Sequence, residues 1–443
     1  MSAKIMLISP PSYGNELTMV NPFPTPPLGL CVLKTELCKY GHDVMILDAA
    51  VIPFDFLSLR NIVSNFKPNI VGITTYYQNL NIIYIAKLIK SISKDIKIVL
   101  GGVMASKFGK LILEIDQDKL IDFVITGAGI KELIEIANGN VDDNELFEKV
   151  NDGFINIEKG DCYLFSGNLY LPNISPVLYK RFHYVFNSGC PFNCAFCVCA
   201  KQLTNSTFNV ESILKEINLL NNIYGHNNFV FLDETLTINK EKLSQISNGI
   251  NSKNITFWGG TRSDCIDGET VEILTKLNFN KLFIGIESTK PETQKFISNK
   301  AQNINDIKYN IDLLHKAGIK VETSLLIGLP FETKEDFEKS LSDVIELGFD
   351  YIMFTFLHII PGTEIYKNYQ EYGYQFIKHA KNLLELFNED NYRVDGKGFV
   401  KSDYLSVDDC NVLLRDTTRK LGYQDRYGKP MGYINNNLSV FPY

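Results

Sequence analysis

The sequence predicts an α/β protein with two successive parallel sheets, the first doubly wound and the second a partial (β/α)6 barrel. Short apolar runs alternate with helical patterns from residue 4 to residue 136, and the alternation starts again at Phe182. Strands that alternate with helices imply right-handed crossovers, which place consecutive strands parallel to each other. Residues 138–181 mix Asn, Asp, Gly and Pro with short strand-like pieces, and we interpret them as a linker.

The first alternation predicts a domain over residues 1–137. Its expected strands are Lys4–Ile8, Asp43–Leu47, Ile70–Thr74, Ile96–Leu100 and Phe123–Ile125. Its expected helices are Leu28–Lys39, Phe54–Phe66 and Leu80–Ser91. Doubly wound sheets bind ligands outside the carboxyl ends of their strands, so the loops that follow these strands are the candidate binding site.

Glycines in those loops let a ligand approach the backbone closely, although tight turns between strand and helix explain them equally well. The candidate residues at the carboxyl ends are Ser9, Pro10, Tyr13, Asp48, Thr74, Tyr76, Tyr77, Gln78, Gly101, Gly102 and Gly127.

The second alternation predicts the barrel over residues 182–366, with its chemistry at the carboxyl ends of the strands. Its expected strands are Phe182–Phe186, Asn228–Leu232, Ile255–Trp258, Lys281–Ile286, Lys320–Ile327 and Tyr351–Phe356. Its expected helices are Val210–Tyr224, Lys240–Asn251, Glu269–Leu277, Ile304–Ala317 and Lys334–Leu347. A mainly helical C-terminal extension follows over residues 367–443, with helices expected at Phe376–Leu386 and Val407–Leu421 and an aromatic tail from Tyr423 to Tyr443.

The composition is that of an ordinary globular protein, with 443 residues, 45% apolar and 21% charged residues, and a net charge of −7. This balance lacks the basic footprint that nucleic acid or an anionic membrane requires, so we expect neither as a partner. The apolar run Ile5–Ile8 is too short for a signal peptide or a membrane span, which predicts a cytoplasmic protein. Thiols stay reduced in that compartment, so clustered cysteines favour a metal or catalytic site over a disulfide.

Three cysteines stand at C-x3-C-x2-C spacing, namely Cys190, Cys194 and Cys197. Three thiolates can hold three irons of a cubane cluster and leave the fourth iron open to another ligand. A structural zinc site normally closes its coordination with a fourth protein ligand, for which Cys199 or His183 is available. The spacing predicts a metal centre, and zinc stays open as the alternative.

Polar residues follow the ends of the predicted barrel strands. They are Cys190 after the first strand, Asp233 and Glu234 after the second, Arg262 after the third, and Glu287 and Ser288 at the fourth, while the fifth strand ends at Gly328, Leu329 and Pro330. Capping, turn or salt-bridge roles explain any one of them, whereas a set on one rim favours a shared ligand. A zwitterionic nucleoside-like ligand suits this rim, because Arg262 would pair with its carboxylate in a fork and Glu287 would accept from ribose hydroxyls.

The first domain resembles the cobalamin-binding domain, of flavodoxin-like type, that precedes many radical S-adenosylmethionine (SAM) enzymes. The resemblance rests on the phrases Pro26–Leu30, Tyr40–Val44, Leu47–Ala49, Gly72–Thr74 and Leu100–Gly102. It implies that the loop residues named above hold cobalamin. The sequence has no D-x-H-x-x-G motif, which implies a base-off cofactor without a histidine ligand and with the loop Thr74–Gln78 on its lower side. Gly127–Ile130 also departs from the acidic residues that relatives usually carry there.

The second domain resembles the radical SAM superfamily. The resemblance rests on the cysteine triad with Phe196, on Gly285–Ser288, on Leu326–Thr333 and on Pro361–Thr363. It implies that Cys190, Cys194 and Cys197 ligate a 4Fe–4S cluster whose open iron is chelated by SAM. It also implies that Asp233 and Glu234 lie near the SAM amino group, Arg262 near its carboxylate, Glu287 and Ser288 near the ribose, and Ile327 and Gly328 near adenine.

Together the two resemblances imply a cobalamin-dependent radical SAM enzyme, most simply a methyltransferase. It would act on an unactivated carbon or phosphorus centre through a 5′-deoxyadenosyl radical and methylcobalamin. Cyclisation, ring contraction or epimerisation is the alternative, and a zinc-stabilised binding module without activity is the second alternative. The expected partners are a small-molecule or peptide substrate and an electron donor such as flavodoxin or ferredoxin. The C-terminal extension either covers the barrel mouth or is an ordinary packing helix with a frayed tail.

Overall fold

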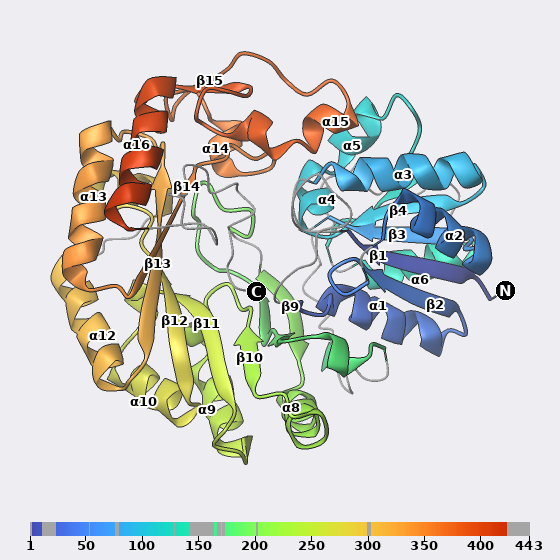
Figure 1. The fold of residues 1–443 in the computed structure, drawn as a ribbon, viewed down its shortest axis with the longest axis horizontal. Helices are drawn as coiled ribbons and strands as arrows, with labels where there is room; N and C mark the ends of the chain where they lie inside the picture. Colours follow the sequence, from blue (N-terminus) through green and yellow to red (C-terminus); the bar gives the residue numbers. More distant parts are fainter. Residues whose placement is uncertain are drawn as a thin grey trace. The chain divides into compact units, whose positions relative to one another are not determined.

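The structure, a computed structural model, consists of two compact units (Figure 1). The first unit comprises residues 1–161, 167–182 and 380–389, and the second comprises residues 162–166, 183–379 and 390–443. The structure describes residues 2–10, 24–52, 54–75, 79–127, 129–140, 164–165, 170, 173–200, 203–298 and 303–422. The candidate residues Tyr13, Tyr76, Tyr77 and Gln78 and the aromatic tail from Tyr423 onward lie outside these ranges.

The first unit contains a five-stranded parallel sheet in the order β2-β1-β3-β4-β5, which confirms the doubly wound arrangement. The central strand β1 is apolar throughout, and its residues Ile5 to Ile8 are buried. The strands are β1 (Lys4–Ser9), β2 (Asp43–Asp48), β3 (Ile70–Thr74), β4 (Lys97–Gly101) and β5 (Phe123–Val124).

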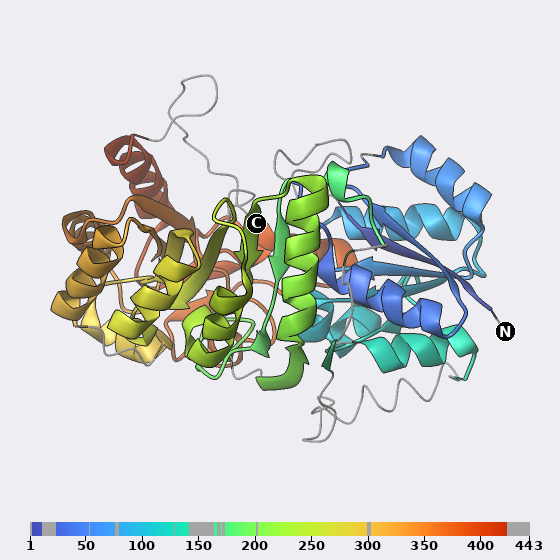
Figure 2. The ribbon, with the colours of Figure 1, turned by 90° about the horizontal axis from the view of Figure 1, so that it is seen from below.

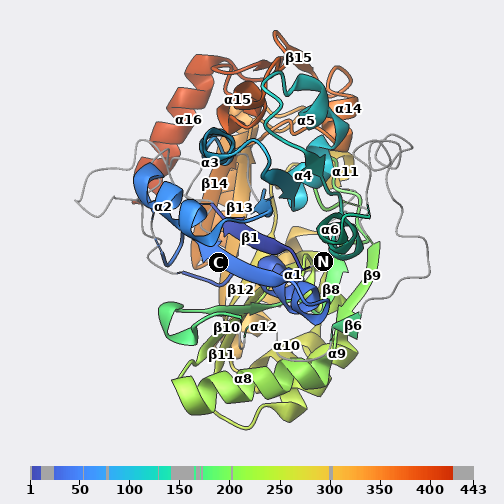
Figure 3. The ribbon, with the colours of Figure 1, turned by 90° about the vertical axis from the view of Figure 1, so that its right-hand side faces the viewer.

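Helices cover both faces of this sheet, as Figures 1 and 3 show. Helices α2 and α3 pack together on one face, and α1 and α6 pack together on the other. Figure 2 shows the strands between these two helix layers. The helices are α1 (Leu28–Lys39), α2 (Phe56–Phe66), α3 (Asn81–Ile92), α4 (Val103–Phe108), α5 (Lys110–Ile115) and α6 (Ile130–Asn138).

Part of the predicted linker is fixed to the first unit by polar contacts. The Asn173 amide donates to the Cys31 carbonyl at 3.1 Å and to the Thr35 hydroxyl at 2.6 Å, both on α1. The Tyr179 hydroxyl donates to the buried carboxyl group of Asp48 at 3.0 Å. Residues 173–182 therefore belong to the structure of the first unit rather than forming a free connection.

We expect Tyr179→Phe to lower the free energy of unfolding by about 1–3 kcal/mol, because it leaves an oxygen of the buried Asp48 carboxyl group without its hydroxyl donor. Urea denaturation of the two proteins measures this difference. Tyr309→Phe is the matched control. Because the Tyr309 side chain is 64% exposed, removing its hydroxyl group should change the free energy of unfolding little. Equal stability of Tyr179→Phe and Tyr309→Phe would contradict the role of this hydrogen bond.

The second unit contains a six-stranded sheet in the order β14-β13-β12-β11-β10-β7, which confirms the partial barrel. Helices α8, α9, α10, α12 and α13 run along one side of it (Figure 1). The strands are β7 (Phe182–Tyr184), β10 (Asn228–Phe231), β11 (Thr256–Arg262), β12 (Phe279–Gly285), β13 (Lys320–Ile327) and β14 (Tyr351–Phe356). The helices are α8 (Val210–Tyr224), α9 (Lys240–Gly249), α10 (Gly268–Lys276), α11 (Pro291–Ser298), α12 (Ile304–Lys316) and α13 (Lys334–Leu347).

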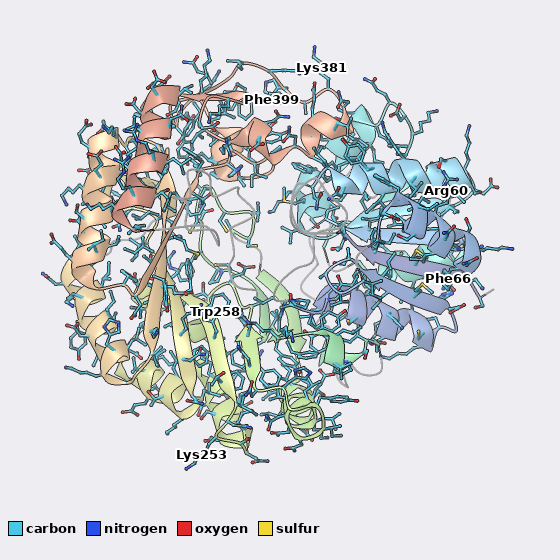
Figure 4. All side chains as sticks on the ribbon, viewed as in Figure 1. Arg60, Phe66, Lys253, Trp258, Lys381 and Phe399 are labelled. Atoms are coloured by element: carbon cyan, nitrogen blue, oxygen red, sulfur yellow. The ribbon has the colours of Figure 1, made fainter. Side chains whose placement is uncertain are left out.

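The two faces of this sheet differ in chemistry. One face is aromatic and fully buried, and Phe231 stacks on Phe257 with ring centroids 4.9 Å apart. On the other face, Lys281 lies 5.1 Å from the ring of Trp258, which is labelled in Figure 4, and forms an ion pair with Glu322 at 2.6 Å. Strand β11 extends four residues beyond its predicted end, so Arg262 is the last residue of that strand.

Smaller elements complete the second unit and the C-terminal extension. A three-stranded sheet in the order β6-β9-β8 was not predicted, and it flanks the cysteine loop on both sides in sequence. Its strands are β6 (Leu164–Phe165), β8 (Asn187–Gly189) and β9 (Leu203–Phe208). The other elements are α14 (Glu364–Lys367), β15 (Tyr374–Phe376), α15 (Leu383–Leu386), β16 (Val400–Ser402), α16 (Val407–Lys420) and the 3-10 turns Pro176–Leu178, Leu236–Ile238, Ser263–Cys265 and Glu389–Tyr392.

The C-terminal extension differs from its prediction in one segment. A helix was expected over Phe376–Leu386, but the chain forms strand β15 up to Phe376 and only a four-residue helix from Leu383. The prediction was wrong because Asn382 caps a helix there, with its side chain accepting from the Glu385 amide at 3.0 Å, and the polar stretch before it offers no apolar face. Helix α16 does form, begins at a Ser406–Asp409 capping box and packs on α13.

Among the described residues, no helix is both long and apolar enough to cross a membrane.

Candidate iron–sulfur, SAM and cobalamin sites

The cysteine loop is fixed by its backbone rather than by regular secondary structure. The Ala195 amide donates to the Ile297 carbonyl at 2.6 Å, and the Ile365 amide donates to the Ala195 carbonyl at 2.9 Å. Ala195 is buried in an apolar cluster with Ile297, Leu329 and Leu357, which come from separate parts of the barrel. The loop therefore has a rigid base, while its three cysteines remain half-exposed.

Each of the three cysteines has a polar neighbour at its sulfur. The Thr235 hydroxyl lies 3.7 Å from the Cys190 sulfur, and Nη1 of Arg262 donates to the Cys194 sulfur at 3.8 Å. The Cys199 amide donates to the Cys197 sulfur at 3.4 Å, and hydrogen bonds from Cys199 lower the pKa of the Cys197 thiol. Hydrogen bonds to thiolate sulfurs are typical of iron–sulfur ligation, so the donor set fits a cluster with three protein ligands.

The geometry does not support the zinc alternative. A single zinc ion binds sulfur at about 2.3 Å, so four ligands must converge on one point. Within the ranges that the structure describes, no group of three or more Cys, His, Asp or Glu side chains converges in this way. Cys199 hydrogen-bonds to Cys197 through its backbone, and His183 is a buried residue of β7.

Asp233 and Glu234 take different positions after β10. Asp233 is buried, and its carboxylate accepts from the Phe186 amide at 2.9 Å, which ties β7 to β10. Glu234 is exposed and forms a hydrogen bond with the Cys199 side chain. Of the two, only Glu234 presents its side chain beside the cysteine loop and toward solvent.

Arg262 does reach the cysteine loop, but its fork is occupied by a neighbour on the same chain. Its Nε donates to Oδ1 of Asp264 at 2.9 Å and its Nη2 donates to Oδ2 at 2.6 Å. The guanidinium carbon lies 3.7 Å from the ring centroid of Phe192, which stands between the first two cysteines. The expected pairing with a ligand carboxylate is thus made by Asp264 in this structure.

Glu287 and Ser288 follow β12 in an unusual backbone conformation. Glu287 has a φ of 61°, in the left-handed region that non-glycine residues rarely adopt. Ser288 is fully buried, and its hydroxyl donates to the buried carboxyl group of Glu332. Backbone strain of about 1–3 kcal/mol persists only where the surroundings enforce it, and the Ser288–Glu332 pair is such a restraint. Glu287 itself is half-exposed at the rim, where ligand hydroxyls can reach it.

Burial raises the pKa of the Glu332 carboxyl group to about 7. A raised folded-state pKa stabilises the protein at low pH, and that stabilisation is lost as pH rises through about 7. We therefore expect the stability of the wild type relative to Glu332→Gln to fall between pH 5 and pH 8, by at most about 3 kcal/mol. Urea denaturation at both pH values tests this, with the exposed Glu338→Gln as control. A constant difference between wild type and Glu332→Gln would contradict the expectation.

Ile327 and Gly328 end β13 under the C-terminal extension. Gly328 has a φ of 86°, and a Cβ at this position would overlap the Cγ2 methyl of Val394. The Tyr374 hydroxyl donates to the Gly328 carbonyl at 2.7 Å, and the Val394 amide donates to the Leu357 carbonyl at 3.0 Å. Tyr374 and Val394 of the extension therefore pack on the carboxyl ends of β13 and β14.

In the first unit, the residues after β1 and β2 are covered by other parts of the chain. Asp48 is 3% exposed, and one of its oxygens accepts from the Ala50 amide at 3.1 Å while the other accepts from Tyr179. Burial raises the pKa of the Asp48 carboxyl group, and Ser9 is another of its hydrogen-bond partners. Pro10 is buried as well. Asp48 therefore anchors Tyr179 of the segment 173–182, and Ser9 supports Asp48.

The carboxyl ends of β3, β4 and β5 are more open. Among the residues that the structure describes, a Cβ on Gly101 or Gly127 would meet no atom within 4 Å, whereas a Cβ on Gly102 would lie 3.1 Å from the Thr74 hydroxyl and the Thr75 amide. Gly127 donates its amide to the Ser106 hydroxyl at 3.0 Å. This edge offers bare backbone and free space, which fits the approach of a large planar cofactor.

A histidine ligand to cobalt is not available in the first unit. His42 is the only histidine in residues 1–182. Its Nδ1 accepts from the Ala3 amide at 3.2 Å, immediately before β1 and β2 begin, so it lies at the amino end of the sheet. The candidate loops lie at the opposite end of the sheet, away from His42.

Four residues of the site escaped the sequence analysis: Phe192, Thr235, Asp264 and Glu332. Phe192 lies inside the cysteine motif and Asp264 lies two residues after Arg262. Both could have been predicted from the sequence, because Phe192 is an aromatic residue between two metal ligands and Asp264 is an acid two residues after an arginine. Thr235 and Glu332 carry no such local signal.

The fold and the cysteine loop define the class of protein: a doubly wound α/β domain followed by a partial barrel that carries a three-thiol cluster loop at its rim. Residues 17–137 match the B12 binding domain family, and residues 184–344 match the radical SAM superfamily. The chain therefore belongs to the radical SAM enzymes that carry a B12-binding domain, and its cofactors are a 4Fe–4S cluster, SAM and cobalamin.

Known proteins resemble the chain over most of its length. An uncharacterised methyltransferase of Pyrococcus horikoshii is 28% identical and covers 93% of this chain and 91% of its own. The anaerobic magnesium-protoporphyrin IX monomethyl ester cyclase of Rubrivivax gelatinosus is 24% identical over 71% of this chain and 61% of its own. The radical SAM methyltransferase TsrM from Kitasatospora setae, solved with cobalamin and a 4Fe–4S cluster, superposes with a TM-score of 0.73 at 16% identity and covers 98% of this chain and 92% of its own.

Proposed function

We propose that the enzyme transfers a methyl group from SAM to an unactivated carbon, or to phosphorus, of a small-molecule or peptide substrate. Two features of the chain carry the proposal: a loop with three cysteines, which would leave one iron of a four-iron cluster without a protein ligand, and a sheet edge with glycines at the strand ends. The full-length similarity to an uncharacterised methyltransferase supports it. Transfer to a carbon that no base can activate requires radical chemistry, and these cofactors provide it.

The residues have separable tasks in this proposal. Cys190, Cys194 and Cys197 hold the cluster, which when bound supplies the electron that cleaves SAM, while cobalamin carries the methyl group. The SAM contacts would come from Asp233, Glu234, Arg262, Glu287, Ser288, Ile327 and Gly328. The buried hydroxyl of Ser288 donates to the buried carboxyl group of Glu332. In this proposal that hydrogen bond holds the neighbouring Glu287 at the rim. Gly328 holds the end of β13 against the C-terminal extension.

The cobalamin contacts would be concentrated on Thr74, Gly101, Gly102 and Gly127, and among the described residues Gly101 and Gly127 have open space beside their backbone. Asp48 would support the site by anchoring Tyr179, and Ser9 would support Asp48, while Pro10 stays a proposed cobalamin contact. We keep the proposed division into residues 1–137 for cobalamin, 138–181 as linker, 182–366 as barrel and 367–443 as extension. The ranges that match the two families support the first and third of these parts.

The products of SAM test the reaction type without knowledge of the product. Methyl transfer leaves S-adenosylhomocysteine, whereas radical initiation leaves 5′-deoxyadenosine. We expect both from anaerobically reconstituted enzyme given hydroxocobalamin, a low-potential one-electron donor such as reduced flavodoxin or ferredoxin, and SAM with a labelled methyl group. We also expect the label in the corrin fraction before any substrate is added. Formation of 5′-deoxyadenosine with no S-adenosylhomocysteine and no labelled corrin would overturn methyl transfer.

A second candidate function is radical cyclisation without net methyl transfer. The similarity to an anaerobic cyclase over 71% of the chain favours it over ring contraction or epimerisation. This candidate predicts 5′-deoxyadenosine as the SAM product and an unlabelled substrate, so the same experiment separates the two functions.

A further inference from the structure

The guanidinium of Arg262 is held beside a cluster ligand by three different contacts. Two of its N–H groups donate to the carboxylate of Asp264 at 2.9 and 2.6 Å, and Nη1 donates to the sulfur of Cys194 at 3.8 Å. The ring of Phe192 lies against its flat face, 3.7 Å from the guanidinium carbon. Arg262 is only 7% exposed, so this charge is fixed and largely removed from water.

This arrangement differs from that of an arginine waiting for a ligand carboxylate. A guanidinium recognises a carboxylate through two parallel N–H groups, and here Asp264 already accepts such a pair. A third donor faces the Cys194 sulfur. The side chain is thus built into the cysteine loop before SAM binds, with Phe192 from the loop on one side and Asp264 from the turn after β11 on the other.

A cation in this place favours a more negative cluster. One-electron reduction adds a negative charge to the cluster and its thiolates, and hydrogen bonds and positive charge at a ligating sulfur stabilise that form. Asp264 carries the opposite charge, but its side chain is 42% exposed and water screens it more strongly than it screens Arg262. The charge of Arg262 therefore dominates at the Cys194 sulfur.

We propose that Arg262, held by Asp264 and Phe192, raises the reduction potential of the cluster through Cys194, in addition to any contact with SAM. The inference rests on the proposed cluster site. The step that it affects is the uptake of one electron from an external low-potential donor by the oxidised cluster, in which no bond is made or broken. Asp264 and Phe192 are positioning residues in this account.

The test is a redox titration of the reconstituted full-length protein without SAM, followed by electron paramagnetic resonance. We compare the wild type with two variants. Arg262→Gln removes the positive charge, whereas Arg262→Lys keeps the charge but loses the paired hydrogen bonds to Asp264 and the stacking on the Phe192 ring. For Arg262→Gln we expect the equilibrium constant for reduction to fall about tenfold, which corresponds to a potential lower by about 59 mV. Arg262→Lys should fall between this variant and the wild type.

Two controls keep the result specific. Lys240→Gln removes a cation of the same unit that pairs with Asp267 at 2.5 Å and Glu269 at 2.9 Å, and its potential should equal that of the wild type. Iron and sulfide analysis verifies four irons per chain in every variant compared. If an Arg262 variant does not assemble its cluster, Phe192→Leu takes its place. This substitution removes the ring that packs on the Arg262 guanidinium, so it should also lower the reduction potential of the cluster.

An Arg262→Gln potential equal to that of the wild type, with only the affinity for SAM reduced, would overturn the inference and leave Arg262 as a SAM ligand alone. That outcome would leave the proposed function intact. Failure of the wild type to bind a cluster at all would instead overturn the proposed function on which the inference rests.

Discussion

Alanine in place of Cys194 is expected to prevent assembly of the 4Fe–4S cluster and to abolish formation of 5′-deoxyadenosine. Removal of an outer-shell partner typically costs 10–100-fold in metal affinity, and loss of one of only three thiolate ligands should cost more. The loss should appear together in iron content, in the brown absorption of the protein and in turnover. The same result is expected for Cys190 and Cys197.

Cys199→Ala is the matched control for this prediction, since Cys199 lies beside the triad and contacts the Cys197 sulfur through its own backbone amide. The backbone hydrogen bond survives the substitution and only the hydrogen bond of the Cys199 side chain is lost, so Cys199→Ala should retain four irons and most of the activity. An active Cys194→Ala enzyme, or a Cys199→Ala enzyme without iron, would contradict the assignment of the three ligands.

Gly328→Ala is expected to destabilise the second unit by about 2–5 kcal/mol. The added methyl group costs about 1–2 kcal/mol at a φ of 86° and a further 1–3 kcal/mol for overpacking against Val394. Urea denaturation measures the change. Binding of SAM should weaken in parallel if the end of β13 contributes to its site.

Gly348→Ala provides a matched control, because Gly348 has nearly the same φ, 88°, but a Cβ there would meet only the flexible amino group of Lys308 at 3.7 Å. It should show the backbone cost alone. In the Gly328→Ala background, Val394→Ala should restore part of the stability by removing the methyl group that is overlapped. Equal effects of the two glycine substitutions would contradict the proposed close packing.

The strands and helices of both sheets and the cysteine loop could be predicted from the sequence, because each depends on residues that are close together in the chain. Both sheets were predicted from apolar runs of strand length and from segments with helical apolar periodicity. Burial on one side imposes these periods on any strand or helix, whatever it packs against. The spacing of Cys190, Cys194 and Cys197 predicted the cluster loop for a similar reason, since one loop supplies all three ligands.

Features that depend on distant partners were out of reach. The hydrogen bond from the Tyr179 hydroxyl to the buried carboxyl group of Asp48 joins residues 131 positions apart in the sequence. Ser288 looked like a ribose contact, yet its hydroxyl donates to Glu332, 44 positions away. No periodicity marks such pairs.

The central claim is that three cysteines hold a 4Fe–4S cluster with one iron open to SAM. Its most direct test is the electron paramagnetic resonance spectrum of the reduced, reconstituted wild type, recorded with and without SAM. We predict the signal of a reduced cubane that changes shape when SAM binds at the open iron. A colourless protein with one zinc ion per chain, or a cluster signal that SAM leaves unchanged, would contradict the claim.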